Sequence, residues 1–168
     1  SRNINSAFLS IAARKIAEFK VKNNQSDTAK VLLRYASNIN QKTGKSATFI
    51  NTQLSRIISA EGQTDSALHY LNKELNRSHT DIELFHIDLA YGYFYLSQSD
   101  LEKAKIYGEK TMNRSRNKPE IAWVREALKL NMLIAEKQEK FNEAYNNLKL
   151  LKYWEDSLMN YDKQKALF

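Results

Sequence analysis

The sequence predicts a nearly all-helical protein. Only four of its 168 residues are Gly and one is Pro, whereas sandwiches, barrels and doubly wound sheets need a Gly- or Pro-containing turn about every 8–12 residues. Leu, Ile, Val and Phe together make up about a quarter of the chain, which is enough to build a core. No apolar run approaches the ~18 residues that span a membrane. The length favours a single domain over residues 1–168.

Caps and breakers predict four helices in the first half of the chain, at 4–22, 27–41, 46–61 and 65–78. Asp27 is the expected N-cap of the second helix and Thr64 that of the fourth. Gly62 is expected to end the third helix. Gly44-Lys45-Ser46 resembles the end of a phosphate-binding loop, but the first Gly of that motif would fall at position 39, which is Ile39. We therefore interpret Gly44 as a helix C-cap.

The second half is expected to contain four more helices, at 82–98, 101–116, 120–138 and 141–165. Asp81 and Asp100 stand where N-caps are needed. Pro119 falls in the first turn of the seventh helix, where its missing N–H has no partner to lose. The connections are short, which makes neighbouring helices antiparallel.

A small residue recurs along the chain. Ala29, Ala67, Ala104 and Ala144 are separated by 38, 37 and 40 residues, and each precedes an apolar residue at the next helical turn. Equal spacings of ~35–40 residues are typical of stacked helical hairpins. The pattern predicts an α-solenoid of about four hairpins, with repeats at 4–41, 46–78, 82–116 and 120–165. Another α-solenoid type or a helix bundle is the alternative.

The third repeat carries a family resemblance. It reads LFHIDLAYGYFYLSQSDLEKAKIYGEKTM, with Gly92 and Tyr95 standing 12 and 9 residues before Ala104. These offsets resemble the tetratricopeptide (TPR) pattern, in which Gly and Ala let the two helices of a hairpin cross closely while Tyr fills the gap beside them. The resemblance implies a right-handed superhelix whose concave face is lined by the first helix of each pair.

The last stretch carries a second resemblance. FNEAYNNLKLLKYWEDSLMNYDKQKALF is similar to the final repeat of large bacterial TPR sensor proteins, in which a long helix leads toward a membrane segment and a histidine kinase or helix-turn-helix output domain. The resemblance, together with the lack of an initiator Met, leads us to expect a piece of a longer signalling regulator. The periplasmic part of a membrane-anchored protein is the favoured location, with the cytoplasm as the alternative.

In TPR proteins the inward face of each first helix makes most ligand contacts. Mapped through the Ala anchors, that face carries Arg14, Glu18, Thr52, Arg56, His86, Leu89, Tyr93, Lys129 and Leu133. This set is basic at one end and apolar or aromatic in the middle, which suits a protein or peptide that carries an acidic group. Tyr91 and Tyr95 share a helix face and favour interhelical packing, whereas Tyr93 points to the opposite, groove-lining side.

The sequence offers little for catalysis. Cys is absent, and His69, His79 and His86 fall on different predicted helices or at their ends, outside any metal-ligand spacing. We therefore expect no enzyme activity, no metal and no cofactor. Residues 1–60 carry a net charge of +8 and the rest of the chain −1, which gives +7 for the whole chain. No nucleic-acid-binding motif accompanies these scattered bases. We expect no direct nucleic-acid or membrane contact.

Three functions remain open at this stage. The first is a sensory or protein-binding segment of a bacterial signalling regulator. The second is a free-standing TPR scaffold or assembly adaptor. The third is a cytosolic peptide-sensing regulator. All three use the same non-covalent mechanism, in which a rigid array of hairpins presents a groove to a protein or peptide.

Overall fold

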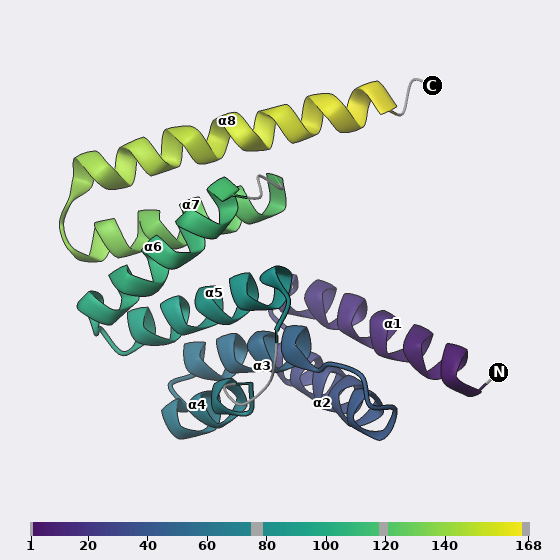
Figure 1. Ribbon diagram of the computed structural model, residues 1–168. Helices are drawn as coiled ribbons and strands as arrows, with labels where there is room; N and C mark the ends of the chain where they lie inside the picture. The colour runs from purple at the N-terminus through teal and green to yellow at the C-terminus, as the bar shows by residue number, and fades with distance from the viewer. Residues whose placement is uncertain (1, 75–78, 118–120, 166–168) are drawn as a thin grey trace. The chain divides into compact units, whose positions relative to one another are not determined.

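The computed structural model describes residues 2–74, 79–117 and 121–165, and side chains between residues 8 and 157 within these ranges. Within these ranges the protein is all-helical, as predicted (Figure 1). The helices are α1 (Arg2–Lys22), α2 (Ser26–Lys42), α3 (Thr48–Ala60), α4 (Thr64–Asn72), α5 (Asp81–Ser97), α6 (Leu101–Asn117), α7 (Ile121–Lys137) and α8 (Phe141–Lys165). Helix ends fall within two residues of their predicted places, except that α4 ends at Asn72 rather than at 78. Pro119 lies outside the described residues.

The chain divides into two compact units, residues 1–90 and 91–168, and the boundary falls inside α5. In the first unit α1 packs against α2, α2 against α3, and α3 against α4. Leu33, Leu54, Ile58, Leu71 and Phe85 are at most 1% exposed and form its core. Each helix thus buries its apolar face mainly against its neighbours in sequence.

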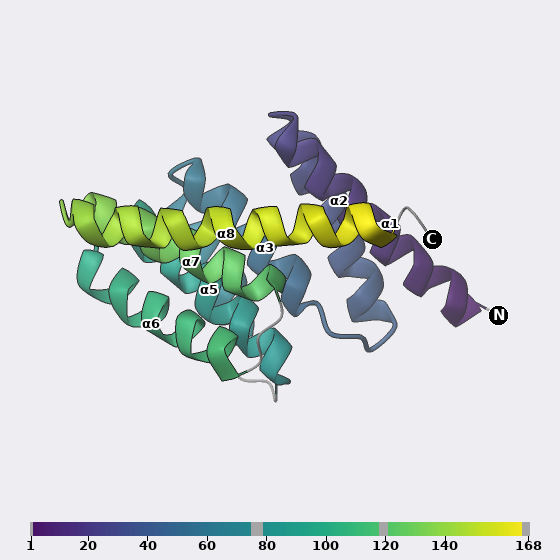
Figure 2. The ribbon, with the colours of Figure 1, turned by 90° about the horizontal axis from the view of Figure 1, so that it is seen from above.

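In the second unit α6 packs against α7 and α7 against α8. Both Figure 1 and Figure 2 show α8 running alongside α7. The C-terminal half of α5 joins this unit through a stack of three rings, in which Tyr107 of α6 lies 5.0 Å from Tyr91 and 5.6 Å from Tyr95 between ring centroids. The sequence-based interpretation of Tyr91 and Tyr95 as packing residues is confirmed.

Five of the turns share one geometry. Asn24, Gly44, Gly62, Ser99 and Glu139 have φ between +57° and +78°. The N–H of the following residue donates to a carbonyl five residues back, at 2.9–3.1 Å in all five turns. This is the Schellman ending of a helix, in which one left-handed residue satisfies the last carbonyls. Gly44 follows α2, between two hairpins, whereas the other four residues stand 38, 37 and 40 apart and each precedes its repeat Ala by five residues. A repeat-like architecture of four hairpin turns is therefore present in the backbone itself.

The repeat Ala residues occupy the helix crossings. Ala29, Ala67 and Ala104 are fully buried, whereas Ala144 on α8 is only half-buried. Helices α2, α4 and α6 are followed by further helices along the chain, whereas no described helix follows α8.

The absence of a side chain at Gly92 makes room for a different helix from the one that the sequence pattern predicts. A Cβ at Gly92 would lie 2.5 Å from Leu130 Cδ2, so this glycine makes room for α7 and not for α6 of its own hairpin. Gly108, which the sequence pattern did not single out, has the same role. A Cβ there would lie 2.7 Å from Asn131 Oδ1 and 2.9 Å from Ile134 Cδ1.

Three of the four predicted N-caps are wrong. Only Asp100 caps its helix, accepting from the Lys103 N–H at 3.2 Å. Helices α2 and α4 begin after Gln25 and Gln63, and neither glutamine side chain makes a cap hydrogen bond. Asp27 and Thr64 are therefore inside the first turn. Helix α5 is capped by Thr80 instead of Asp81, as described below.

The buried alanines generate a stability prediction. Ala67→Leu or Ala104→Leu forces added methylenes into a closed helix crossing and is expected to lower the free energy of unfolding by about 1–3 kcal/mol. Urea denaturation measures the change. Ala122→Leu is the control, because Ala122 is exposed on α7. Equal stabilities of the three variants would show that the Ala positions are not packed crossings.

Candidate functional site

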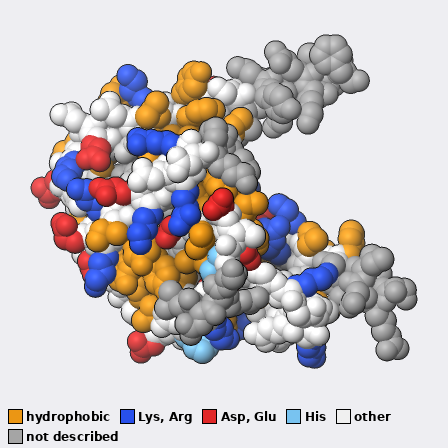
Figure 3. Space-filling view, viewed as in Figure 1, with side chains coloured by type: hydrophobic (Ala, Val, Ile, Leu, Met, Phe, Trp, Pro, Cys, Tyr) orange, Lys and Arg blue, Asp and Glu red, His pale blue; other side chains and the backbone are white. Residues whose placement is uncertain are grey.

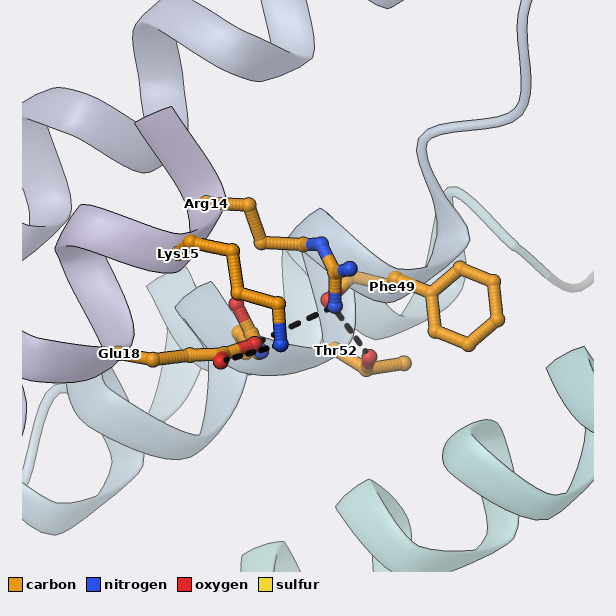
Figure 4. A network of polar contacts seen from close by, with 6 residues as sticks. Arg14, Lys15, Glu18, Phe49 and Thr52 are labelled. Atoms are coloured by element: carbon orange, nitrogen blue, oxygen red, sulfur yellow. Dashed lines mark hydrogen bonds and ion pairs between the residues drawn. The ribbon is translucent and has the colours of Figure 1, made fainter. Parts of the chain in front are cut away.

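A cluster of charged and aromatic side chains spans α1, α3 and the start of α5, all within the first unit. Its centre is the carboxylate of Glu18, which accepts from Arg14 at 3.2 Å, Lys15 at 3.3 Å and Gln53 at 3.0 Å (Figure 4). Two cations and one anion leave this end of α1 positively charged. Arg14 and Glu18 are only about 30% exposed at their side chains, so the pair is partly shielded from water.

Phe49 joins the charged residues to His86. The Arg14 guanidinium carbon lies 5.9 Å from the centre of the Phe49 ring, within cation–π range. The His86 ring meets the same phenyl edge-on, with 4.8 Å between centroids. The structure thus brings together Arg14, Glu18 and His86, three of the side chains that the family resemblance pointed to, around an aromatic ring that it did not.

The surroundings of His86 favour its neutral form. Burial lowers the pKa of His86 to about 4, and the positive charges of Arg56 and Arg14 act in the same direction, while Glu18 opposes them. Near neutral pH His86 is therefore an uncharged ring that can donate one hydrogen bond and accept another.

A pocket of about 160 Å³ opens beside this cluster. Its lining residues are Ser10, Ile11, Arg14, Asn40, Ser46, Phe49 and Ile50. The Asn40 amide donates to the Ser46 carbonyl at 2.6 Å, while its buried Oδ1 accepts no hydrogen bond within the described part of the chain. Cavities of about 150 Å³ hold a benzene-sized group. The pocket therefore fits one ligand side chain, with the cation of Arg14 on its wall.

The other predicted contact residues are more scattered. Thr52 and Leu89 are 3% and 1% exposed and lie in the core of the first unit, where the Thr52 hydroxyl donates to the Phe49 carbonyl. Arg56 is half-buried on α3. The remaining three belong to the second unit, with Lys129 exposed and Tyr93 and Leu133 half-buried. No single described unit holds the whole predicted set.

Sequence reasoning missed Phe49, Gln53 and Asn40. A signal for Phe49 was available, because it stands 37 residues before His86 and so has the same place in its repeat. Asn40 carried no such signal. Its amide enters the pocket because α2 ends beside the start of α3, which is a property of the packed helices.

A buried polar network at the start of α3 was also missed. Glu74 is 1% exposed, and its carboxylate accepts from Thr48 Oγ1 at 2.6 Å and Asn51 Nδ2 at 2.5 Å. Ser46 is 3.0 Å from Thr48 and donates to Glu83. Residues distant in sequence thereby hold the beginning of α3 in place.

Glu83 also completes the cap of α5. Its carboxylate accepts from the Thr80 N–H and hydroxyl at 3.0 Å, while the Glu83 N–H donates to Thr80 Oγ1 at 3.3 Å. This reciprocal arrangement is a capping box. Burial alone would raise the pKa of Glu83, but hydrogen bonds from Ser46 and Thr80 and the nearby His79 lower it to about 2.

Metal-binding clusters and membrane-spanning helices are both absent from the described residues. Among them no group of three His, Cys, Asp or Glu side chains is arranged to hold a metal ion. None of the described helices combines the length and hydropathy needed to cross a bilayer. Comparison of the chain with protein-family models, curated proteins and solved structures finds no match.

The environment of His86 predicts an acid-sensitive fold. A histidine with a folded pKa of about 4 and an ordinary value of 6.5 takes up its proton more readily when unfolded. The free energy of unfolding is therefore expected to fall as the pH drops from 6.5 to 4. His86→Gln should flatten this part of a urea-denaturation profile. The control His69→Gln keeps His86 and should keep the slope, so equal slopes in all three proteins would contradict the assignment.

Glu83 predicts a second loss of stability at lower pH. The pKa of Glu83 is about 2 in the folded chain, against an ordinary value of 4.5. The ionised carboxylate therefore stabilises the fold above pH 4.5, and this contribution disappears as the pH falls toward 2. Glu83→Gln should lower the free energy of unfolding at pH 7 by about 1–3 kcal/mol. The variant should also weaken the dependence of the free energy of unfolding on pH between 4.5 and 2, where Asp27 and Asp100 still contribute. Glu102→Gln, at an exposed site in the first turn of α6, is the control.

Proposed function

We propose that this chain is a non-enzymatic module of TPR-like hairpins that binds an acidic peptide or protein segment. The observation that carries the proposal is the pocket between α1, α2 and α3, with Arg14 and Phe49 on its wall. Phe49 supplies a rigid apolar surface. Arg14 supplies a cation next to it.

The charges around the pocket favour an acidic partner. Arg14, Lys15 and Arg56 outnumber the two nearest carboxylates, that of Glu18 and that of Glu83, which accepts from Ser46 in the pocket wall. Arg56 is near enough to influence the ionisation of His86. An approaching carboxylate would meet a net positive field in a partly desolvated site, where charge pairing is stronger than in open water. A basic segment would be repelled by the same field.

The repeated turns support the TPR-like part of the proposal. Four Schellman endings at intervals of 37–40 residues, each followed by a small residue five positions later, fit an array of hairpins. In such an α-solenoid the first helices of successive hairpins line one concave face, which is where Arg14, Phe49 and His86 would lie. The parent protein is then a signalling regulator with its output domain elsewhere, with a free-standing scaffold or a cytosolic peptide sensor as the alternatives.

The binding proposal predicts a charge-selective interaction. The probe is a pool of fluorescein-labelled dodecapeptides that carry one Leu or Phe flanked by Glu residues, compared with the same peptides in which Lys replaces Glu. Fluorescence anisotropy should detect binding of the acidic pool only. Arg14→Gln and Arg56→Gln should each weaken binding about 5- to 10-fold, the range for loss of one partly buried charge contact.

The matched control is Arg34→Gln, which removes an exposed cation of α2 that does not line the pocket. It lowers the net charge by the same amount and should leave the affinity unchanged. Equal affinity for the acidic and basic pools, or equal effects of all three arginine variants, would contradict a specific site at Arg14.

A further inference from the structure

The large apolar side chains that remain exposed are gathered on two helices. Of fifteen such residues in the described part of the chain, eleven belong to α1 or α8. Figure 3 shows apolar side chains at the surface over both helices. On α1 the exposed residues Phe8, Leu9, Ile16 and Phe19 fall on one side of the helix by their spacing, and on α8 Phe141, Tyr145 and Leu148 do the same.

The repeat register shows what covers these positions elsewhere in the protein. Leu54 of α3 has the same repeat position as Ile16. Leu54 is 0% exposed, whereas Ile16 is 48% exposed. Ile134 of α7 has the same repeat position as Phe19, and it is 3% exposed whereas Phe19 is 63% exposed. Ile134 lies directly against α6, because a Cβ at Gly108 would be 2.9 Å from its Cδ1. This face of a first helix therefore packs on the second helix of the hairpin before it.

The exposed face of α8 is the other half of that interface. Leu148 has the same place in its repeat as Leu33 in α2, Leu71 in α4 and Gly108 in α6. All three equivalents are buried, whereas Leu148 is 38% exposed. Leu148 thus stands at a position where the second helix of one hairpin contacts the first helix of the next hairpin. Among the described residues no such helix covers it.

We propose that the α8 face of one chain receives the α1 face of a second copy, so that copies associate head to tail and continue the array of hairpins. The contact would reproduce the α2–α3 interface of the first unit. In that interface Leu33 of α2 stands at the repeat position of Leu148 of α8. Leu54 and Ile57 of α3 stand at the repeat positions of Ile16 and Phe19 of α1. Every pair in this comparison is apolar, so the two exposed faces match in chemistry as well as in register.

The interface is heterologous, because two different faces meet. A chain of copies keeps one free α1 face at one end and one free α8 face at the other, so association does not stop at a dimer. A contact between single helix faces belongs to the small end of specific interfaces. We expect a dissociation constant on the order of 10–100 μM.

Sedimentation velocity across about 1 μM to 1 mM protein tests the proposal. The wild-type chain should form a growing series of oligomers. Phe19→Glu and Tyr145→Glu should each remain monomeric over most of this range, with the dissociation constant raised about tenfold or more. Mixing the two variants should give a 1:1 heterodimer and nothing larger, because each retains one intact and complementary face.

Ile106→Glu is the matched control, since Ile106 is an exposed apolar residue on α6, outside both faces. It should associate as the wild type does. Helical circular dichroism confirms that each variant is folded. A wild-type chain that stays monomeric overturns the proposal. The α1 and α8 faces would then pack on helices that do not come from a second copy of this chain. A dimer abolished by Phe19→Glu but not by Tyr145→Glu also overturns it, because α1 would then pack on α1.

Discussion

Close approach of neighbouring helices at small side chains is the constraint on which the rest of this structure depends. Ala29, Ala67 and Ala104 are fully buried at the crossings, and Gly92 and Gly108 leave room for side chains of α7 that a single methyl group would displace. Protein interiors are packed as densely as organic crystals, so these positions have little freedom to grow. The left-handed residue five positions before each repeat Ala fixes where that Ala enters the crossing, which couples the turns to the packing.

The candidate site is a consequence of this spacing. Helices α1 and α3 are brought near enough for Gln53 to share the Glu18 carboxylate with Arg14, and for Phe49 to lie between Arg14 and His86. The network of Glu74 and Glu83 holds the start of α3 through hydrogen bonds from Thr48, Asn51 and Ser46. Buried carboxylates are tolerated here because several donors surround each of them. The pocket therefore has walls that are fixed before a ligand arrives, which lowers the entropy cost of binding.

Helix α1 presents two chemically different faces. Arg14 and Glu18 are directed toward α3, whereas Ile16 and Phe19 fall on another side of the helix and are largely exposed. A polar and aromatic surface suits a charged segment, and an apolar stripe suits another helix. The two surfaces make ligand binding and association between copies compatible in one molecule, since neither requires residues of the other.

The sequence by itself determined the helices and their period. Scarce Gly and Pro, apolar spacing and the Ala recurrence located eight helices because these signals depend on neighbours along the chain. It could not locate the left-handed turns at Ser99 and Glu139, since neither residue type marks such a turn. Nor could it show that Thr52 and Leu89 are buried, that Asn40 enters a pocket, or that Glu74 and Glu83 meet the start of α3. Only the tertiary structure decided these points, because each depends on which helices pack together and not on local chain preference.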